Sequence, residues 1–136
     1  MPQFTPIFIP GLLCTEFLFA KQRAALSNAG LIGDTRQHDS INGMAQLALD
    51  QCTGALLPVG LSMGGYVALE MARLAPERIA GMALLSTNAG VDNDERANER
   101  RQAIKLATHK GFKGITRSFL SQLISMTAPV DSVLAD

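Results

Sequence analysis

A serine stands between two glycines, in the segment Gly60-Leu61-Ser62-Met63-Gly64, at the junction of two hydrophobic patterns. The apolar run over residues 55–59 predicts a short strand buried on both faces, as in parallel sheets that helices cover on both sides. From residue 65 onward, apolar side chains recur at helical spacing until Pro76 stops the helix. The junction therefore predicts a strand, a sharp turn at Ser62 and a helix.

The two glycines fit a strained turn of the kind that presents a nucleophile. Such a turn holds the serine backbone in a sparsely allowed conformation, and side chains two residues to either side would collide with neighbouring backbone. Glycine at positions 60 and 64 removes that collision. Because the helix begins just after Ser62, its free N–H groups point to where an acyl oxyanion would form, and the Met63 N–H is one candidate donor. The alternative is an ordinary serine in a glycine-rich loop.

A second oxyanion donor is expected from the loop that follows an earlier strand. Residues 6–9 form an apolar run typical of a strand, and Pro10 and Gly11 end it in a turn. The Leu12 N–H is therefore the candidate for the second donor.

These segments resemble the α/β-hydrolase superfamily, in particular small bacterial hydrolases with PGLLC near the start and GLSMGGYVALEMARLAPERIAGMALL around the nucleophile, here residues 10–14 and 60–85. The resemblance covers nearly all of the chain. It implies that Ser62 is the nucleophile, that the N–H groups of Leu12 and Met63 form the oxyanion hole, and that no metal or cofactor takes part. Pro10 stands where many relatives have histidine, a change that leaves the backbone donor intact.

Alternating strand and helix patterns predict an α/β fold with a parallel sheet. The expected elements, in chain order, are strand 4–9, helix 17–29, strand 31–35, a helix to residue 51 capped by Ser40, strand 55–59, helix 65–75 and strand 79–86. The resemblance implies a sheet in which the first strand lies between the second and the third, and the third lies beside the fourth.

The composition changes after Ser86. A charged stretch over residues 92–101 continues into an amphipathic helix to about residue 109, and a second helix is expected over 116–126. In relatives, helices inserted here cover the pocket. We therefore expect a hydrolase core with the nucleophile turn in residues 1–90 and the beginning of a helical cap in residues 91–136. The charged side chains are individually expected to face solvent.

The catalytic triad of this fold runs serine, acid, histidine along the chain, with the last two on loops after later strands. Serine is a poor nucleophile until a base takes its proton. His109 lies in the expected cap helix, and His38 follows a strand two spacings, about 10 Å, from the nucleophile strand. Asp92 or Asp94 could mimic the acid, but an acid without its histidine orients nothing. The pattern predicts an α/β-hydrolase fold truncated after the start of the cap.

Two features of the expected sheet are unusual for a free-standing chain. Pro58 removes one hydrogen-bond donor from a central strand. The strand at 79–86 would leave an open edge and invite pairing with another chain, so self-association through this edge is expected.

Net charge, targeting patterns and cysteine content bear on binding partners, location and thiol chemistry. Twelve basic and twelve acidic residues cancel, so the charge favours neither nucleic acid nor an anionic membrane as a partner. The sequence shows no leader pattern and no membrane-spanning run, which favours a cytoplasmic location. Cys14 and Cys52 have neither metal-site spacing nor a disulfide framework, so both are expected to be reduced thiols with packing roles.

The sequence thus predicts a serine hydrolase that acts on a small-molecule carboxylic ester or a related acyl substrate. Thioester, lactone or carbon–carbon cleavage and cofactor-free haloperoxidation occur on the same scaffold, and the residues do not separate them. Because the triad acid and histidine are missing, two alternatives stay open. The chain is a non-catalytic truncated remnant or association module, or a partner chain supplies the histidine.

Overall fold

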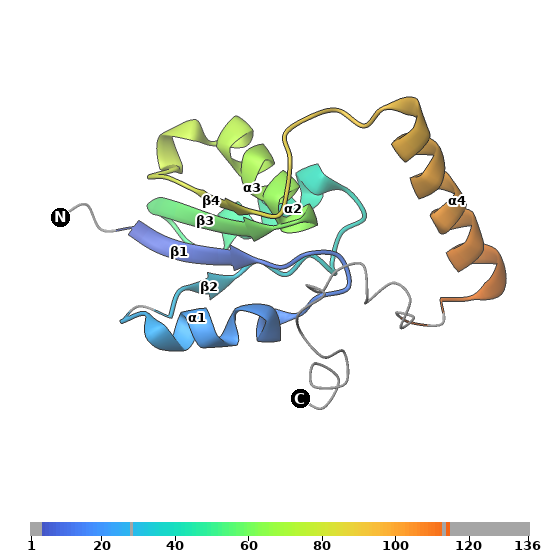
Figure 1. Ribbon diagram of the computed structural model, residues 1–136. Helices are drawn as coiled ribbons and strands as arrows, with labels where there is room; N and C mark the ends of the chain where they lie inside the picture. The colour runs from blue at the N-terminus through green and yellow to red at the C-terminus, as the bar shows by residue number, and fades with distance from the viewer. Residues whose placement is uncertain (1–3, 28, 113, 115–136) are drawn as a thin grey trace. The chain divides into compact units, whose positions relative to one another are not determined.

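The computed structural model describes residues 4–27, 29–112 and 114 of the chain. The chain divides into two units, residues 1–90 and 91–136. The first unit is a four-stranded parallel sheet with helices on both faces (Figure 1). The α/β class expected from the sequence is therefore confirmed. None of the helices in the described ranges is long and apolar enough to cross a membrane.

All of the sheet's strand pairs are parallel. The strands are β1 (Phe4–Ile9), β2 (Leu31–Ile32), β3 (Ala55–Leu61) and β4 (Ala83–Leu85), in the order β2-β1-β3-β4. This is the order that the resemblance implied. Since the strands are parallel, their carboxyl ends meet at one edge of the sheet, where the loops after β1, β3 and β4 come together.

The core lies between the sheet and two helices on one of its faces, α2 (Ile41–Asp50) and α3 (Met63–Leu74). Fully buried apolar residues of the two central strands pack against these helices: Ile7, Ile9 and Leu56. The 3-10 helix η1 (Glu16–Phe19) and α1 (Ala20–Ala25) lie on the opposite face (Figure 1). There the buried ring of Phe19 packs on Phe8, with 5.2 Å between ring centroids.

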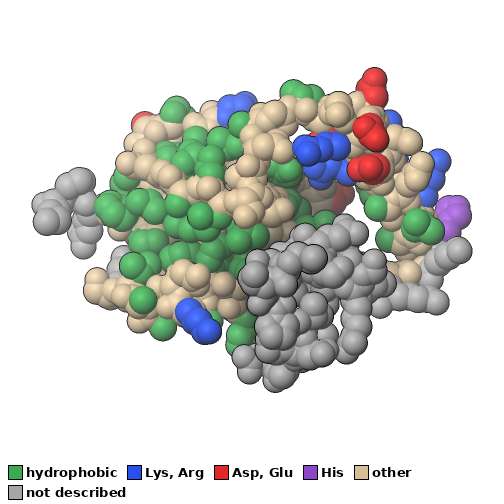
Figure 2. All heavy atoms as spheres, in the orientation of Figure 1, with side chains coloured by type: hydrophobic (Ala, Val, Ile, Leu, Met, Phe, Trp, Pro, Cys, Tyr) green, Lys and Arg blue, Asp and Glu red, His purple; other side chains and the backbone are tan. Residues whose placement is uncertain are grey.

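Apolar side chains remain exposed on the face of the sheet that carries α1. Figure 2 shows hydrophobic side chains gathered over the strands on this face. Phe4 at the start of β1 is 40% exposed, and Leu85 at the end of β4 is 42% exposed. Of the described elements, η1 and α1 cover only part of this face, over β1.

Side-chain caps define both ends of α2. The Ser40 hydroxyl accepts the Gly43 N–H at 3.1 Å, which confirms the predicted N-cap. At the other end the Arg78 guanidinium donates to the carbonyl oxygens of Leu49, Cys52 and Gly54. A cation at a helix C-terminus satisfies the free carbonyl groups and the helix dipole. Arg78 belongs to the 3-10 helix η2 (Pro76–Arg78), which follows α3 where Pro76 was expected to stop it.

Two expected elements are shorter in the structure. The helix expected over 17–29 ends at Ala25, because Leu26 is already extended, with φ −95° and ψ 139°. The strand expected over 31–35 pairs only at Leu31 and Ile32. The Asp34 carboxylate accepts the backbone N–H of Arg36 at 3.0 Å, and a local turn of this kind competes with strand pairing.

The strand expected over 79–86 is also shorter, and the reason involves Pro58. Ile79 forms an isolated bridge with Leu56, but the next pair is Val59 with Ala83. Between these two pairs, the segment before β4 therefore contains one more residue than the facing part of β3. One extra residue on one strand is what defines a β-bulge. Pro58 lies opposite the bulge, where a strand can lack an N–H donor without losing a ladder hydrogen bond.

The described part of the second unit is a loop and the helix α4 (Asp94–Lys110). The Asn93 side chain caps it by accepting the Arg96 N–H at 2.9 Å. A helix is therefore present where the charged stretch predicted one, but it is not the expected amphipathic helix, because its apolar side chains do not gather on one face. The helix expected over 116–126 lies outside the described residues.

Candidate active site

Ser62 forms the turn between β3 and α3. β3 ends at Leu61 and α3 begins at Met63, so the predicted strand, turn and helix are all present. Ser62 has φ 53° and ψ −116°, outside the regions that residues with a Cβ favour. Such a conformation costs on the order of 1–3 kcal/mol and persists only where the surroundings impose it. The residue is exposed, and an exposed serine at this kind of turn is typical of a nucleophile.

The packing around the turn explains both flanking glycines. A Cβ on Gly60 would lie 2.3 Å from the carbonyl oxygen of Gly64. A Cβ on Gly64 would lie 2.0 Å from the carbonyl oxygen of Ile9 in β1. Both distances are far below van der Waals contact. The turn therefore packs directly on backbone, and no side chain fits at either position.

The loop after β1 approaches Ser62 from one side. A Cβ on Gly11 would lie 3.4 Å from the Cβ of Ser62. The next residues form a turn in which the Cys14 N–H donates to the Gly11 carbonyl oxygen at 3.1 Å. Leu13, at the third position, has φ 62°, the pattern of a type II turn. Leu12 is the second residue of this turn. It directly follows Gly11, the residue that lies against Ser62.

The end of β4 holds the serine turn from the other side. The Ser62 N–H donates to the Leu85 carbonyl oxygen at 2.9 Å, and the Thr87 hydroxyl donates to the Ser62 carbonyl oxygen at 2.8 Å. Thr87 is a contact of the serine turn that the sequence pattern did not predict. The available signal was its place just after the fourth expected strand, because the carboxyl ends of neighbouring parallel strands meet at one edge.

Within the described residues of the first unit, His38 is not hydrogen-bonded to Ser62. His38 lies at the first turn of α2, where a Cβ on Gly43 would be 2.8 Å from its Nδ1. β2, the strand before His38, is separated from β3 by β1, as expected. His109 lies in α4, in the second unit.

The two candidate acids also belong to the second unit. Asp92 forms an ion pair with Arg100, with 2.7 Å between the carboxylate Oδ2 and Nε. Asp94 is the first residue of α4, where a negative charge favours the helix dipole. Both positions give these carboxylates a local structural role.

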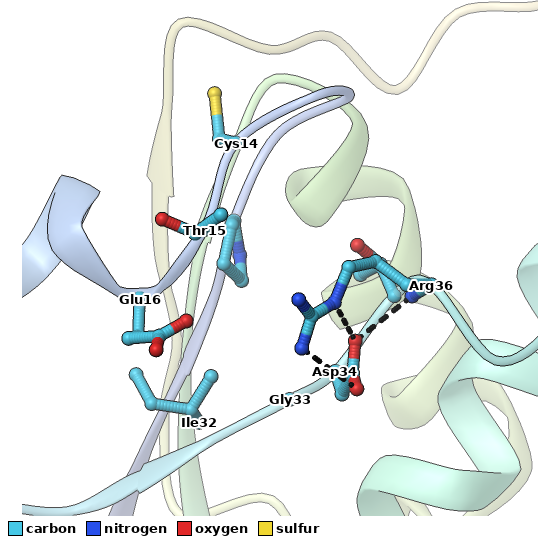
Figure 3. A pocket seen from close by; sticks show the side chains of 9 residues that line it. Cys14, Thr15, Glu16, Ile32, Gly33, Asp34 and Arg36 are labelled. Carbon is cyan, nitrogen blue, oxygen red and sulfur yellow. Dashed lines mark hydrogen bonds and ion pairs between the residues drawn. The ribbon is translucent and has the colours of Figure 1, made fainter.

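A small hollow lies beside the β1 loop, between that loop and the segment after β2 (Figure 3). Its volume is about 20 Å³, room for about one water molecule. An acyl group therefore does not fit there. Asp34 lines it, and hydrogen bonds from the side chain and then the backbone N–H of Arg36 hold the pKa of Asp34 well below its usual range.

A larger hollow of about 290 Å³ lies beside α3, close to the lower size limit of small-molecule sites. Hydrogen bonds from Arg73 and then Asn42 lower the pKa of Glu70, which lines it, to about 2. Ser62 lines neither of these two hollows. The lining comes from α2, α3 and the loop after β4: Ile41, Tyr66, Leu69, Glu70, Arg73, Asn88, Ala89 and Gly90.

The described part of the chain contains no cluster of metal-binding side chains. Across residues 4–27, 29–112 and 114, no group of three or more His, Cys, Asp or Glu side chains could hold a metal ion. Both cysteines are free thiols. Cys52 packs against the core, and the Cys14 thiol lies 3.6 Å from the Leu12 carbonyl oxygen.

Comparison with known proteins bears on the fold. No family model matches the chain, and no curated protein matches it. Among solved structures, the chain is similar to a malate-bound thermophilic esterase from Thermogutta terrifontis, with a TM-score of 0.72 and 24% sequence identity. The match covers 90% of this chain and 49% of the esterase chain. The chain has a hydrolase-like α/β fold. It spans about half the length of the esterase that it resembles.

Proposed function

We propose that this chain carries the nucleophile of a serine hydrolase of the α/β-hydrolase superfamily, acting on carboxylic esters or related small acyl substrates. One observation carries the proposal: Ser62 is exposed with φ 53° between the end of β3 and the first turn of α3. Its support is the turn itself, because a strained backbone at an exposed polar residue persists where function needs it. The esterase-like fold adds to that support.

The proposed reaction forms an acyl-enzyme. The Ser62 Oγ attacks the carbonyl carbon of the ester while a base takes the hydroxyl proton. The carbonyl oxygen becomes an oxyanion, which the N–H groups of Met63 and Leu12 stabilise. The C–O bond to the alcohol breaks and the alcohol leaves with that proton. In the second step a water oxygen bonds to the acyl carbon, the bond from that carbon to Ser62 Oγ breaks, and a proton from the water passes through the base to Oγ, which releases the carboxylic acid.

The base is the part of this mechanism that the described residues of the first unit do not provide. His38 packs at the start of α2 and His109 lies in the second unit. The proposal therefore includes a histidine supplied by a second copy of this chain, which is present in a solution of the chain alone.

The test is the intact mass of the folded chain after exposure to a fluorophosphonate. We expect addition of one phosphonyl group to the wild type and none to Ser62→Ala. The matched control is Ser86→Ala, because Ser86 is also an exposed serine with positive φ, 45°, but does not begin a helix. Labelling that persists in Ser62→Ala would contradict the proposal.

The second candidate is a non-catalytic association module. Two observations favour it: His38, the histidine of the first unit, is not hydrogen-bonded to Ser62, and apolar side chains are exposed on one face of the sheet (Figure 2). A folded wild type that takes no label would favour this candidate over the hydrolase.

A further inference from the structure

The carbonyl group of Ser62 and the N–H of Met63 belong to one peptide unit. A peptide unit is planar, and in the trans form its C=O and N–H point in opposite directions. No peptide bond in the described residues is cis. Whatever fixes the direction of the Ser62 carbonyl therefore also fixes the direction of the Met63 N–H.

The Ser62 carbonyl oxygen accepts two hydrogen bonds from different elements. The Gly65 N–H donates from the first turn of α3 at 2.9 Å, and the Thr87 hydroxyl donates from the loop after β4 at 2.8 Å. The Gly65 bond lies within the serine's own turn. The Thr87 bond adds a donor from outside α3, which ties the Ser62 carbonyl group to the loop after β4.

Thr87 is itself held in place by contact with α3. A Cβ on Gly65 would lie 2.5 Å from the Thr87 Cγ2 and 2.6 Å from its Oγ1. The threonine side chain thus occupies the space that a side chain at position 65 would need. The Ser62 N–H also donates to the Leu85 carbonyl oxygen. Both backbone polar groups of Ser62, its N–H and its carbonyl, are therefore hydrogen-bonded to the segment at the end of β4.

We propose that Thr87 is a positioning residue for the oxyanion hole: its hydroxyl aims the Met63 N–H at the developing oxyanion. Hydrogen bonds in series also polarise one another, so a donor on the Ser62 carbonyl makes the Met63 N–H a stronger donor. This inference rests on the proposed function for the role of Met63. The orientation of the peptide unit is a separate claim that needs no activity.

Two variants of Thr87 separate its hydroxyl from its methyl group. Thr87→Val keeps the shape and loses the hydrogen bond, whereas Thr87→Ser keeps the hydroxyl and loses the methyl. Thr108→Val is the matched control, because the Thr108 hydroxyl also donates to a backbone carbonyl oxygen, that of Ile104, but in α4. Thermal melts establish that each variant is folded.

The first measurement is the rate constant for fluorophosphonate labelling of Ser62. We expect about a tenfold loss in Thr87→Val, less than the loss on removing an oxyanion donor outright. Thr87→Ser should recover most of that loss, and Thr108→Val should match the wild type. An equal loss in Thr87→Ser and Thr87→Val would assign the effect to packing of the methyl group and overturn the proposal, as would no loss in Thr87→Val.

The second measurement is the orientation and mobility of the Met63 N–H by residual dipolar couplings and 15N relaxation. We expect an order parameter near the rigid value of about 0.85 in the wild type and Thr87→Ser, and a lower one with a changed coupling in Thr87→Val. An unchanged N–H in Thr87→Val overturns the inference, whatever the labelling shows. A wild type that takes no label, together with a reoriented N–H in Thr87→Val, refutes the proposed function and the oxyanion role while leaving the orientation claim standing.

Discussion

The close approach of backbone at Gly64 is the strictest steric requirement near the serine turn. An added Cβ would lie 2.0 Å from the carbonyl oxygen of Ile9, and backbone of a central strand cannot give way as the end of a flexible side chain can. Relief would require α3 to move away from β1. The same displacement would shift the first turn of the helix, and with it the Met63 N–H.

We expect Gly64→Ala to lower the free energy of unfolding by about 3 kcal/mol, because it overpacks a site bounded by backbone. Urea unfolding followed by circular dichroism measures the change. The control is Gly81→Ala, because a Cβ there meets no heavy atom within 4 Å, and its effect should stay within about 0.5 kcal/mol. Equal stabilities for the two variants would contradict the steric explanation.

At the scale of the elements, α2 and α3 are joined by a polar network as well as by the core. The Glu70 carboxylate of α3 accepts from Arg73 at 2.7 and 2.8 Å and from Asn42 of α2 at 2.9 Å. The Glu70 side chain is only 19% exposed. This network gives the helix pair a pH dependence, because the hydrogen bonds need an ionised carboxylate.

The pKa of Glu70 is lowered from 4.5 to about 2 in the folded chain, mainly by Arg73. The unfolded chain therefore takes up the proton at higher pH than the folded chain. The resulting stability is fully present above pH 4.5 and is lost as the pH falls towards 2.

We expect Glu70→Gln to be less stable than the wild type by about 0.5–1 kcal/mol at neutral pH, in keeping with a partly exposed network. This difference should shrink as the pH falls below 4.5 and vanish below about pH 2. Urea unfolding of both proteins across this pH range measures it. Glu77→Gln, in exposed η2, is the control. A difference that does not depend on pH would show that Glu70 acts through packing alone.

The sequence predicted the order of strands and helices because each has a clear hydrophobic period. It overestimated three lengths, at α1, β2 and β4, and local backbone features end the two strands early. The Asp34 turn with Arg36 and the bulge opposite Pro58 depend on backbone geometry, which a pattern of apolar residues does not encode. The serine turn was predictable from its glycines. Thr87 was missed because its role comes from a contact 25 residues away in sequence.

At the scale of the whole molecule, the unpaired sheet edge formed by β4 is shorter than the strand expected over 79–86. β4 has three residues, and a short edge strand offers few free backbone groups for pairing. The exposed side chains of Phe4 and Leu85 add apolar area on the adjoining face. With a formal net charge of zero, two copies of the chain do not repel each other strongly, which favours association.

We expect the isolated chain to associate with a second copy as its concentration rises, and Leu85→Lys to weaken this association by placing a charge on the apolar face. Sedimentation velocity over a series of concentrations measures it. Val91→Lys is the matched control, because Val91 is 99% exposed in the loop before α4. A wild type that stays monomeric throughout, or an equal effect of the two lysines, would contradict this surface as the contact.

The connection between the two units starts at the serine turn. Thr87, whose hydroxyl holds the Ser62 carbonyl, lies three residues before the end of the first unit at Gly90. The last residues of the first unit are therefore anchored to the serine turn through the Thr87 hydroxyl. Asn88, Ala89 and Gly90, the residues that directly follow Thr87, also line the larger hollow beside α3, so a molecule bound in that hollow would lie against the segment that holds the serine turn.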